Sequence, residues 1–177
     1  MRIKDKEFKI YIPESEIAAI VQRVAGEVNR DYAGTEDLVA CPILTGSFLF
    51  AADLLRNLDI PCEVSFVRYT SYSGMDSTGT VKCSLPFPPA IEGRDVLLIE
   101  DVVDSGLSMN HMLQAINALH PKSVRICSLF FKPNAFKGDY KVDYVGREIG
   151  NEFIVGYGLD YDEQGRTLKD VWVVEND

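Results

Sequence analysis

The segment 96–108 constrains the fold more than any other part of this 177-residue sequence. Its first four residues are apolar with a β-branched bias, which predicts a buried strand. Two adjacent carboxylates, Glu100 and Asp101, follow that strand. A third, Asp104, begins a Ser/Gly turn that opens a segment of helical periodicity. A strand, a tight turn and a helix in this order predict one unit of a parallel α/β sheet.

The same order recurs elsewhere in the chain. Residues 38–44 form a continuous apolar run suited to a strand buried on both faces, and a helical segment follows through residue 58. Further helices are expected over residues 14–29 and 109–119, and further strands over 62–66, 123–131, 143–147 and 153–158. The alternation predicts an α/β fold with a central, mainly parallel sheet flanked by helices.

Length and composition indicate an ordinary globular protein. A chain of this length can build one substantial core, so residues 1–177 are expected to form a single domain. Hydrophobic residues make up 46% of the chain and charged residues 25%, with no apolar stretch long enough to cross a bilayer. The first residues contain no apolar signal core. We therefore expect a cytoplasmic protein that does not contact membranes.

The net charge of −9 argues against a nucleic-acid surface, because phosphate backbones are bound through clustered Lys and Arg, and the sequence has no such cluster. Any phosphate ligand must therefore be held locally. The four cysteines are far apart and none belongs to a C-x-x-C pair, so buried thiols are expected rather than disulfides or zinc ligands.

The turn that follows the acids is suited to a phosphate. Backbone amides at a helix N-terminus point outward without partners, and Gly106 lets the chain approach an anion closely. Ser105 and Ser108 can add hydroxyl donors. Carboxylates beside a phosphate would repel it, so they imply a bridging cation or a polyol that needs hydrogen-bond acceptors. A ribose phosphate with Mg²⁺ satisfies both requirements.

Other polar groups follow other strands, and in open parallel sheets ligands bind beyond the carboxyl ends of the strands. These groups are Thr45, Gly46, Ser47, Ser71, Tyr72 and Lys132. Residues 69–80 are rich in Ser, Thr and Gly, as expected of a loop that moves over a site. An ordinary exposed hairpin would have the same composition.

Three competing motifs fail on spacing. Residues 160–165 imitate the start of an EF-hand calcium loop, but position 12 is Val171 where a bidentate Glu is required. No Gly-Lys-Ser/Thr follows Gly106, which excludes a nucleotide P-loop. Asp101 and Asp104 are separated by two residues, whereas a haloacid dehalogenase needs Asp-x-Asp after its strand.

Residues 96–108 resemble the phosphoribosyl pyrophosphate (PRPP) binding motif of the type I phosphoribosyltransferases, and nearly the whole chain resembles the hypoxanthine-guanine members of that family. Further matches in the family's order are the Leu44-Thr-Gly-Ser turn, the Ser71-Tyr72 pair, Lys132, and residues 153–161 with Arg166. The resemblance implies the family's fold, with a small hood built from the chain ends. It also implies a Mg²⁺-dependent purine salvage transferase that joins hypoxanthine or guanine to PRPP, giving IMP or GMP and pyrophosphate.

The resemblance also implies roles for the acids and the turn. Glu100 and Asp101 would accept hydrogen bonds from the ribose hydroxyls and anchor magnesium. Asp104 would be the general base, taking the purine N7 proton while N9 attacks the anomeric carbon. The 5′-phosphate would be held by the backbone of Asp104, Ser105, Gly106, Leu107 and Ser108.

The remaining implied roles concern the purine and the pyrophosphate. Lys132 would donate to the purine 6-oxo group, Phe153 would stack on the ring, and Ile154 would offer its backbone carbonyl. Asp160 would hold a second magnesium ion and Arg166 would bind pyrophosphate. The Ser71-Tyr72 loop would exclude water, and the turn at Thr45, Gly46 and Ser47 would bind pyrophosphate through its amides and contain a strained peptide.

The sequence departs from the family pattern at Thr45, where many relatives carry Lys or Arg, so a side-chain cation is missing from the pyrophosphate turn. Other readings remain open. The enzyme could prefer xanthine or belong to a pyrimidine-linked branch, or the chain could be a regulator that senses PRPP without catalysis. The family resemblance implies a homodimer or homotetramer.

Overall fold

The structure is a computed structural model that describes residues 1–71 and 81–175. At its centre is a five-stranded sheet in the order β4-β3-β7-β8-β9, with every neighbouring pair parallel. Its strands are β3 (Leu38–Pro42), β4 (Cys62–Val64), β7 (Asp95–Val103), β8 (Ser123–Phe131) and β9 (Tyr144–Glu148). The expected parallel α/β sheet is confirmed.

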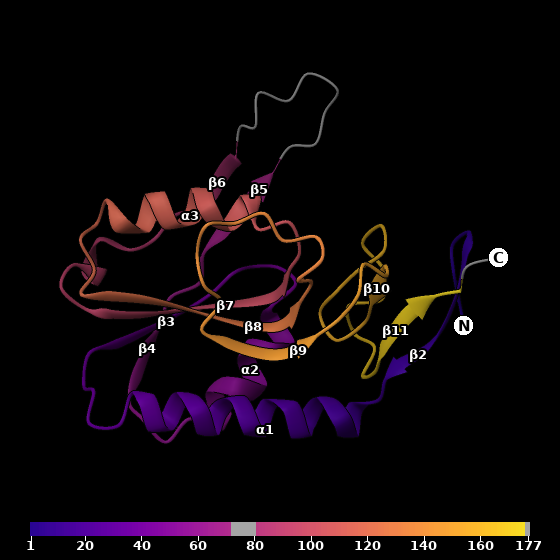
Figure 1. The fold of residues 1–177 in the computed structure, drawn as a ribbon, viewed down its shortest axis with the longest axis horizontal. Coiled ribbons are helices and arrows are strands. Elements are labelled where there is room, and N and C mark those ends of the chain that lie inside the picture. The colour runs from indigo at the N-terminus through magenta and orange to yellow at the C-terminus, as the bar shows by residue number, and fades with distance from the viewer. Residues whose placement is uncertain (72–80, 176–177) are drawn as a thin grey trace.

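Helices cover both faces of this sheet (Figure 1). On one face lie α1 (Glu14–Asp31) and α2 (Phe48–Arg56), and on the other lies α3 (Leu107–Asn117). Leu97 and Ile99 of β7 belong to the core on the α1 and α2 side, whereas Val96 and Leu98 belong to the core on the α3 side. Successive side chains of a strand point to opposite faces, so a strand buried on both faces must be apolar throughout.

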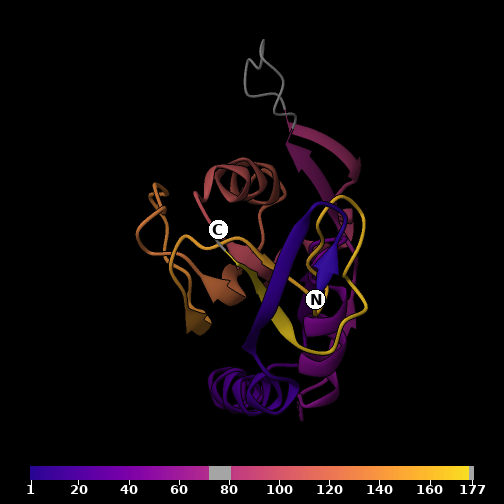
Figure 2. The same ribbon diagram turned by 90° about the vertical axis from the view of Figure 1, so that its right-hand side faces the viewer.

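A second, antiparallel sheet forms the expected hood and joins the two ends of the chain (Figure 2). Its order is β1-β2-β11-β10, from β1 (Arg2–Ile3), β2 (Lys6–Ile12), β11 (Val171–Val174) and β10 (Ile154–Val155). The strand expected over residues 153–158 is therefore wrong in length. Gly156, Tyr157 and Gly158 all have positive φ, at 104°, 48° and 102°, which ends the extended conformation.

A two-stranded antiparallel sheet projects from the main body, with β5 (Arg68–Ser71) paired to β6 (Val81–Leu85). The segment expected as a loop therefore begins as a hairpin strand. A short 3₁₀ helix, η1 (Pro89–Ile91), leads from β6 toward β7. Among the residues that the structure describes, no helix has the length and apolar character needed to span a membrane.

Candidate active site

The acids lie within the last residues of the central strand, not beyond it. β7 continues past Glu100 and Asp101 and stays paired to β8 as far as Val103, which is buried. The sequence predicts a strand that ends at these acids, and in the structure the strand continues two residues further. Both acids are half-buried, at the end of the sheet where α2 and α3 also begin.

Asp101 lies against the turn that follows β3. A Cβ atom at Gly46 would overlap the Asp101 carboxylate, so only glycine fits there without a shift. Asp101 Oδ1 accepts a hydrogen bond from the Val102 amide at 2.8 Å. Burial, and then the neighbouring Asp101 charge, raise the pKa of Glu100 well above its ordinary range. A cation that bridges these acids would relieve their mutual repulsion.

Residues 104–108, here called the phosphate turn, present backbone amides. Gly106 caps α3 with φ of 78°. Within the described part of the chain, no amide from Ser105 to Ser108 donates to a backbone carbonyl. The turn lines a pocket of about 120 Å³ together with Glu100. Unpaired amides at a helix N-terminus favour an anion.

The loop of residues 132–140 packs against the carbonyl side of the phosphate turn. The Lys137 amide donates to the Ser105 carbonyl at 3.0 Å, and the Tyr140 hydroxyl donates to the Gly106 carbonyl at 3.1 Å. The Phe136 ring packs where a Cβ at Gly106 would lie. Because the loop engages these carbonyls, the peptide groups are held with their amides facing away from it. Sequence reasoning missed Phe136 and Tyr140, since no local pattern relates them to the turn.

Lys132 and Asp104 form an ion pair, with 2.9 Å between Nζ and Oδ2. Lys132 is 8% exposed even though it follows the end of β8, and its amide donates to the Val103 carbonyl. Asp104 is exposed at the start of the phosphate turn. The structure thus brings the expected purine-binding cation and the expected general base into direct contact.

The turn of residues 44–47, here called the pyrophosphate turn after its expected role, joins β3 to α2. The Leu44–Thr45 peptide bond is cis, and Thr45 is exposed. The Ser47 hydroxyl is fully buried and donates to the Ile43 carbonyl at 2.6 Å. Ser47 therefore offers a ligand its backbone amide rather than its side chain.

Phe153 precedes β10 and is 44% exposed, on a hollow of about 420 Å³ that it lines with Asn151, Glu152 and Val174. Its ring stands edge-on to Tyr161, with 5.6 Å between ring centroids, and 6.4 Å from Phe8 of the hood. Ile154 is buried and pairs with Val173. An exposed aromatic ring fixed from behind by other rings is suited to stacking on a flat ligand. Phe8 was not anticipated.

Asp160 and Arg166 form an ion pair, with 2.8 Å between Oδ1 and Nη2. The other Asp160 oxygen accepts from the Glu163 amide, and Arg166 Nη1 donates to the Gly158 carbonyl. A metal ion on Asp160 or an anion on Arg166 would have to open this pair. Ser71 ends β5 opposite Val81, and Tyr72 lies outside the described residues.

Across the described residues, no three His, Cys, Asp or Glu side chains converge on a metal ion. The adjacent Glu100 and Asp101 carboxylates still fit Mg²⁺, which is commonly held by one or two carboxylates together with substrate oxygens and water. A cation at Glu100 and Asp101 would thus need further oxygen ligands from a bound substrate and from water.

Comparison with known proteins identifies the class. A family model described as "Phosphoribosyl transferase domain" matches residues 11–162. The chain is 37% identical to a hypoxanthine-guanine phosphoribosyltransferase of Aquifex aeolicus over 175 residues, 98% of either chain. It is 38% identical to that of Bacillus subtilis over 168 residues, covering 94% of this chain and 93% of the relative.

A crystal structure of a hypoxanthine-guanine phosphoribosyltransferase from Bacillus anthracis has the same fold. It matches with a TM-score of 0.89 and 34% sequence identity, over 97% of this chain and all of that one. The parallel sheet, its hood and the strand-turn-helix motif are those of a type I phosphoribosyltransferase. Within that class, the chain belongs to the hypoxanthine(-guanine) phosphoribosyltransferases, the purine salvage transferases. Members of this family generally use Mg²⁺.

Proposed function

We propose that this enzyme transfers the phosphoribosyl group of PRPP to N9 of hypoxanthine or guanine, with Mg²⁺, giving IMP or GMP and pyrophosphate. The observation that carries this assignment is the contact between Lys132 and Asp104 beside the amide-lined phosphate turn. A cation for the purine oxygen and a carboxylate for the purine proton thus stand next to a site suited to the sugar phosphate.

The phosphate turn binds the 5′-phosphate through its outward amides, while Glu100 and Asp101 accept hydrogen bonds from the ribose hydroxyls. Magnesium supplies charge neutralisation for the pyrophosphate when bound, and Glu100 with Asp101 would hold it. Support for this comes from the position of Asp101 directly against Gly46 of the pyrophosphate turn. The acids therefore lie between the phosphate turn, which is assigned to the sugar phosphate, and the pyrophosphate turn, which is assigned to the leaving group.

At the anomeric carbon, the bond to the pyrophosphate oxygen breaks and the electron pair leaves with pyrophosphate. The bond to N9 then forms, and the N7 proton passes to Asp104, which relieves positive charge on the purine. Bond breaking runs ahead of attack, through an oxocarbenium-like state, so catalysis consists mainly of charge stabilisation and exclusion of water. Closure over the site is assigned to Ser71 and Tyr72, and it remains a prediction.

The purine is held by three residues. Lys132 donates to the 6-oxo group, which selects against adenine because adenine presents donors there. Phe153 stacks on the ring and the Ile154 carbonyl accepts from the ring edge. For the Lys132 role, the ammonium must turn from Asp104 toward the base. Its burial favours this exchange of partners, since a buried charge needs one.

Pyrophosphate is assigned to the amides of Thr45, Gly46 and Ser47 and to Arg166, with Asp160 holding a second magnesium ion. Support comes from Gly158, whose carbonyl accepts from Arg166 and whose Cα lies against the Gly46 carbonyl. Arg166 is thereby hydrogen-bonded to the segment that contacts the pyrophosphate turn. Because Thr45 carries no charge, this turn relies on amides and on the cation.

The direct test is pyrophosphate release from PRPP with a panel of bases: hypoxanthine, guanine, xanthine, adenine and a pyrimidine. We expect release with hypoxanthine or guanine and little with adenine. A preference for xanthine would replace the proposed base choice, and no release with any base would contradict the catalytic assignment.

Asp104→Asn tests the general base. We expect kcat to fall by about 10²-fold or more, because the amide cannot take the proton, while the KM for PRPP changes little. Steady-state kinetics with varied PRPP separates the two. Unchanged turnover would rule out Asp104 as the base.

The wider setting is also a proposal. We infer a cytoplasmic homodimer or homotetramer, in keeping with the family resemblance. Light scattering after size-exclusion chromatography measures the mass in solution, and a monomer would contradict this expectation.

A further inference from the structure

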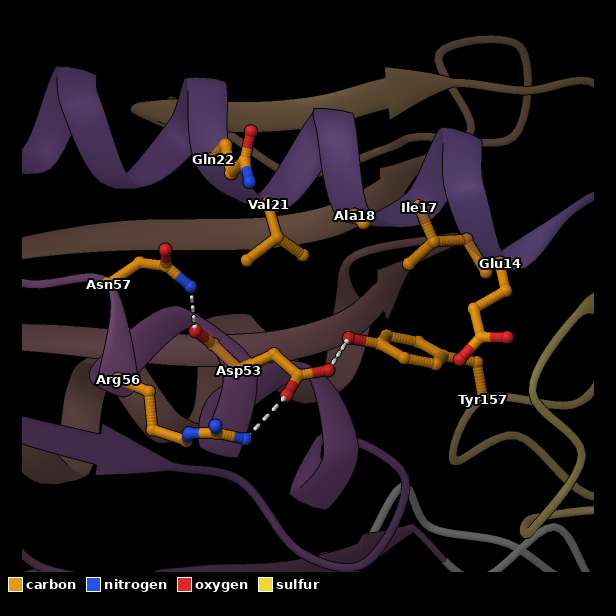
Figure 3. A pocket seen from close by; sticks show the side chains of 9 residues that line it. All are labelled: Glu14, Ile17, Ala18, Val21, Gln22, Asp53, Arg56, Asn57 and Tyr157. Carbon is orange, nitrogen blue, oxygen red and sulfur yellow. Dashed lines mark hydrogen bonds and ion pairs between the residues drawn. The ribbon is translucent and has the colours of Figure 1, made fainter.

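Tyr157 lies between the purine-binding strand and the pyrophosphate turn, and no step of the mechanism above uses it. It follows β10 in a left-handed backbone conformation and is 7% exposed. Its hydroxyl donates to Asp53 Oδ2 of α2 at 2.6 Å (Figure 3). α2 begins directly after the pyrophosphate turn, so this hydrogen bond joins the hood segment to the helix that carries the turn.

The next residue makes a second contact with the same turn. A Cβ atom at Gly158 would overlap the Gly46 carbonyl oxygen, so the two backbones touch there. The Gly158 amide donates to the Arg166 carbonyl, and the Gly158 carbonyl accepts from the Arg166 guanidinium. Tyr157 and Gly158 therefore pack the segment after β10 against the pyrophosphate turn and α2. The hydrogen bonds of Gly158 also connect this segment to Arg166.

Asp53 is itself held in place. Arg56 Nη1 lies 3.8 Å from Asp53 Oδ1, and the Asn57 side chain donates to the Asp53 carbonyl at 2.8 Å (Figure 3). Tyr157 and Asp53 line a cavity of about 330 Å³ together with residues of α1. Burial, and then the Asp53 hydrogen bond, raise the pKa of Tyr157, which keeps its hydroxyl protonated as a donor.

We propose that Tyr157 is a positioning residue for the pyrophosphate turn. Through Asp53 it fixes α2, and with α2 the amides of Thr45 and Gly46, against the segment that carries Asp160 and Arg166. This inference rests on the proposed placement of pyrophosphate at that turn. The proposal predicts a selective effect. The affinity for PRPP and pyrophosphate depends on the Tyr157–Asp53 hydrogen bond, and the affinity for the purine does not.

Tyr157→Phe removes the hydroxyl and keeps the ring. A hydrogen bond to a charged partner contributes enough to binding that we expect KM to rise about tenfold for PRPP and, in the reverse reaction, for pyrophosphate. The KM values for hypoxanthine and IMP should change less than about twofold, because the purine and the 5′-phosphate are held elsewhere.

Variants at Asp53 define the partner. Asp53→Leu removes the acceptor and should reproduce the Tyr157→Phe effect, while Asp53→Asn keeps an acceptor oxygen and should recover most of the wild-type affinity. The double variant Tyr157→Phe/Asp53→Leu should be no worse than either single variant, because both remove one interaction. Ala52→Ser, at an exposed position of the same helix, is the matched control and should leave every KM unchanged.

Thr45→Lys separates this inference from the proposed function. Thr45 is exposed, so a lysine there adds a cation to the turn without crowding, and the KM for pyrophosphate should fall. If Thr45→Lys leaves both PRPP and pyrophosphate unaffected, the pyrophosphate assignment is wrong. If it lowers their KM but Tyr157→Phe raises all four KM values equally, or only lowers the melting temperature, the positioning role of Tyr157 is overturned.

Discussion

At the scale of single residues, the ion pair between Lys132 and Asp104 is the central feature of the site. Each side chain has a ligand-directed role in the proposed mechanism, yet here each neutralises the other at 2.9 Å. A buried ammonium without a partner is costly, so Asp104 stabilises Lys132, and in the proposed mechanism a purine oxygen takes the place of Asp104. Under this proposal the ion pair is the ligand-free arrangement, and substrate binding replaces it.

Lys132→Ala tests this exchange. Without the ammonium, the 6-oxo group loses its charged donor, so the KM for hypoxanthine and guanine should rise at least about tenfold. Steady-state kinetics with varied base concentration measures this KM. The control is Lys137→Ala, which changes an exposed lysine of the same loop. Wild-type activity in Lys132→Ala would contradict the base pocket assigned here.

The candidate site residues come from motifs that are local in the chain, and their roles remain predictions. The acids lie in the last residues of β7, the phosphate turn follows β7 and Lys132 follows β8, so two adjacent parallel strands bring them together. Which contact forms between them could not be predicted. The Lys132–Asp104 pair and the Tyr157–Asp53 bond join distant segments, and no periodicity or spacing encodes the direction of a side chain.

At the scale of elements, polar contacts connect β7 to β8, or to the residues next to these strands, at both ends of the pair. Their carboxyl ends carry the acids and Lys132, and at the opposite end Asp95 accepts from Lys122 at 2.7 Å and from Ser123 at 2.6 Å. These contacts fix where β8 starts relative to β7, and hence where Lys132 emerges beside Asp104. The hydrogen bond from Lys122, and then that from Ser123, lower the pKa of Asp95.

Asp95→Asn should destabilise the protein by about 1 to 2 kcal/mol at neutral pH, because the variant loses the charge that pairs with Lys122. The effect is no larger because Lys122 is exposed and solvent screens part of the interaction. The pKa of Asp95 is lower in the folded state than in the unfolded state. Its contribution is therefore fully present above the unfolded value of about 3.9 and is lost as the pH falls through the folded value. Urea unfolding at several pH values measures the difference.

The gap between wild type and Asp95→Asn should stay constant from pH 8 to about 5 and shrink below about pH 4. Asp139→Asn, an exposed acid in the 132–140 loop, is the control and should have little effect. A gap that widened on acidification would show that the sign of this linkage is wrong.

At the scale of the whole molecule, the hood links the two ends of the chain to Phe153, the residue proposed to stack on the purine. Phe8 of β2 is buried, and its ring lies 6.1 Å from Tyr161 and 6.4 Å from Phe153. β2 pairs with β11, so the start of the chain supports the Phe153 ring, to which the proposed mechanism assigns stacking on the base. The hood could be expected from family resemblance alone, because β1 and β10 are too short for their pattern to identify them.

Phe8→Ala should lower stability by about 3 to 5 kcal/mol and raise the KM for the purine, because a cavity opens behind Phe153. We propose that residues 1–177 are one domain, so calorimetry should show a single transition at a lower temperature. Ile10→Ala, exposed on the same strand, should shift stability by less than about 0.5 kcal/mol. A separate early transition in Phe8→Ala would divide the hood from the sheet and contradict the single domain.

The 132–140 loop has a consequence for redesign. Its first residue, Lys132, is assigned to the base in the proposed mechanism, and its later residues, through the Lys137 amide and the Tyr140 hydroxyl, engage the carbonyls of the phosphate turn. Exchanging this stretch for that of an enzyme with another nucleobase preference would disturb the nucleotide's anionic end in the same step. An engineer who seeks a new base must therefore graft Lys132 alone, or carry Gly106 and its neighbours along with the loop.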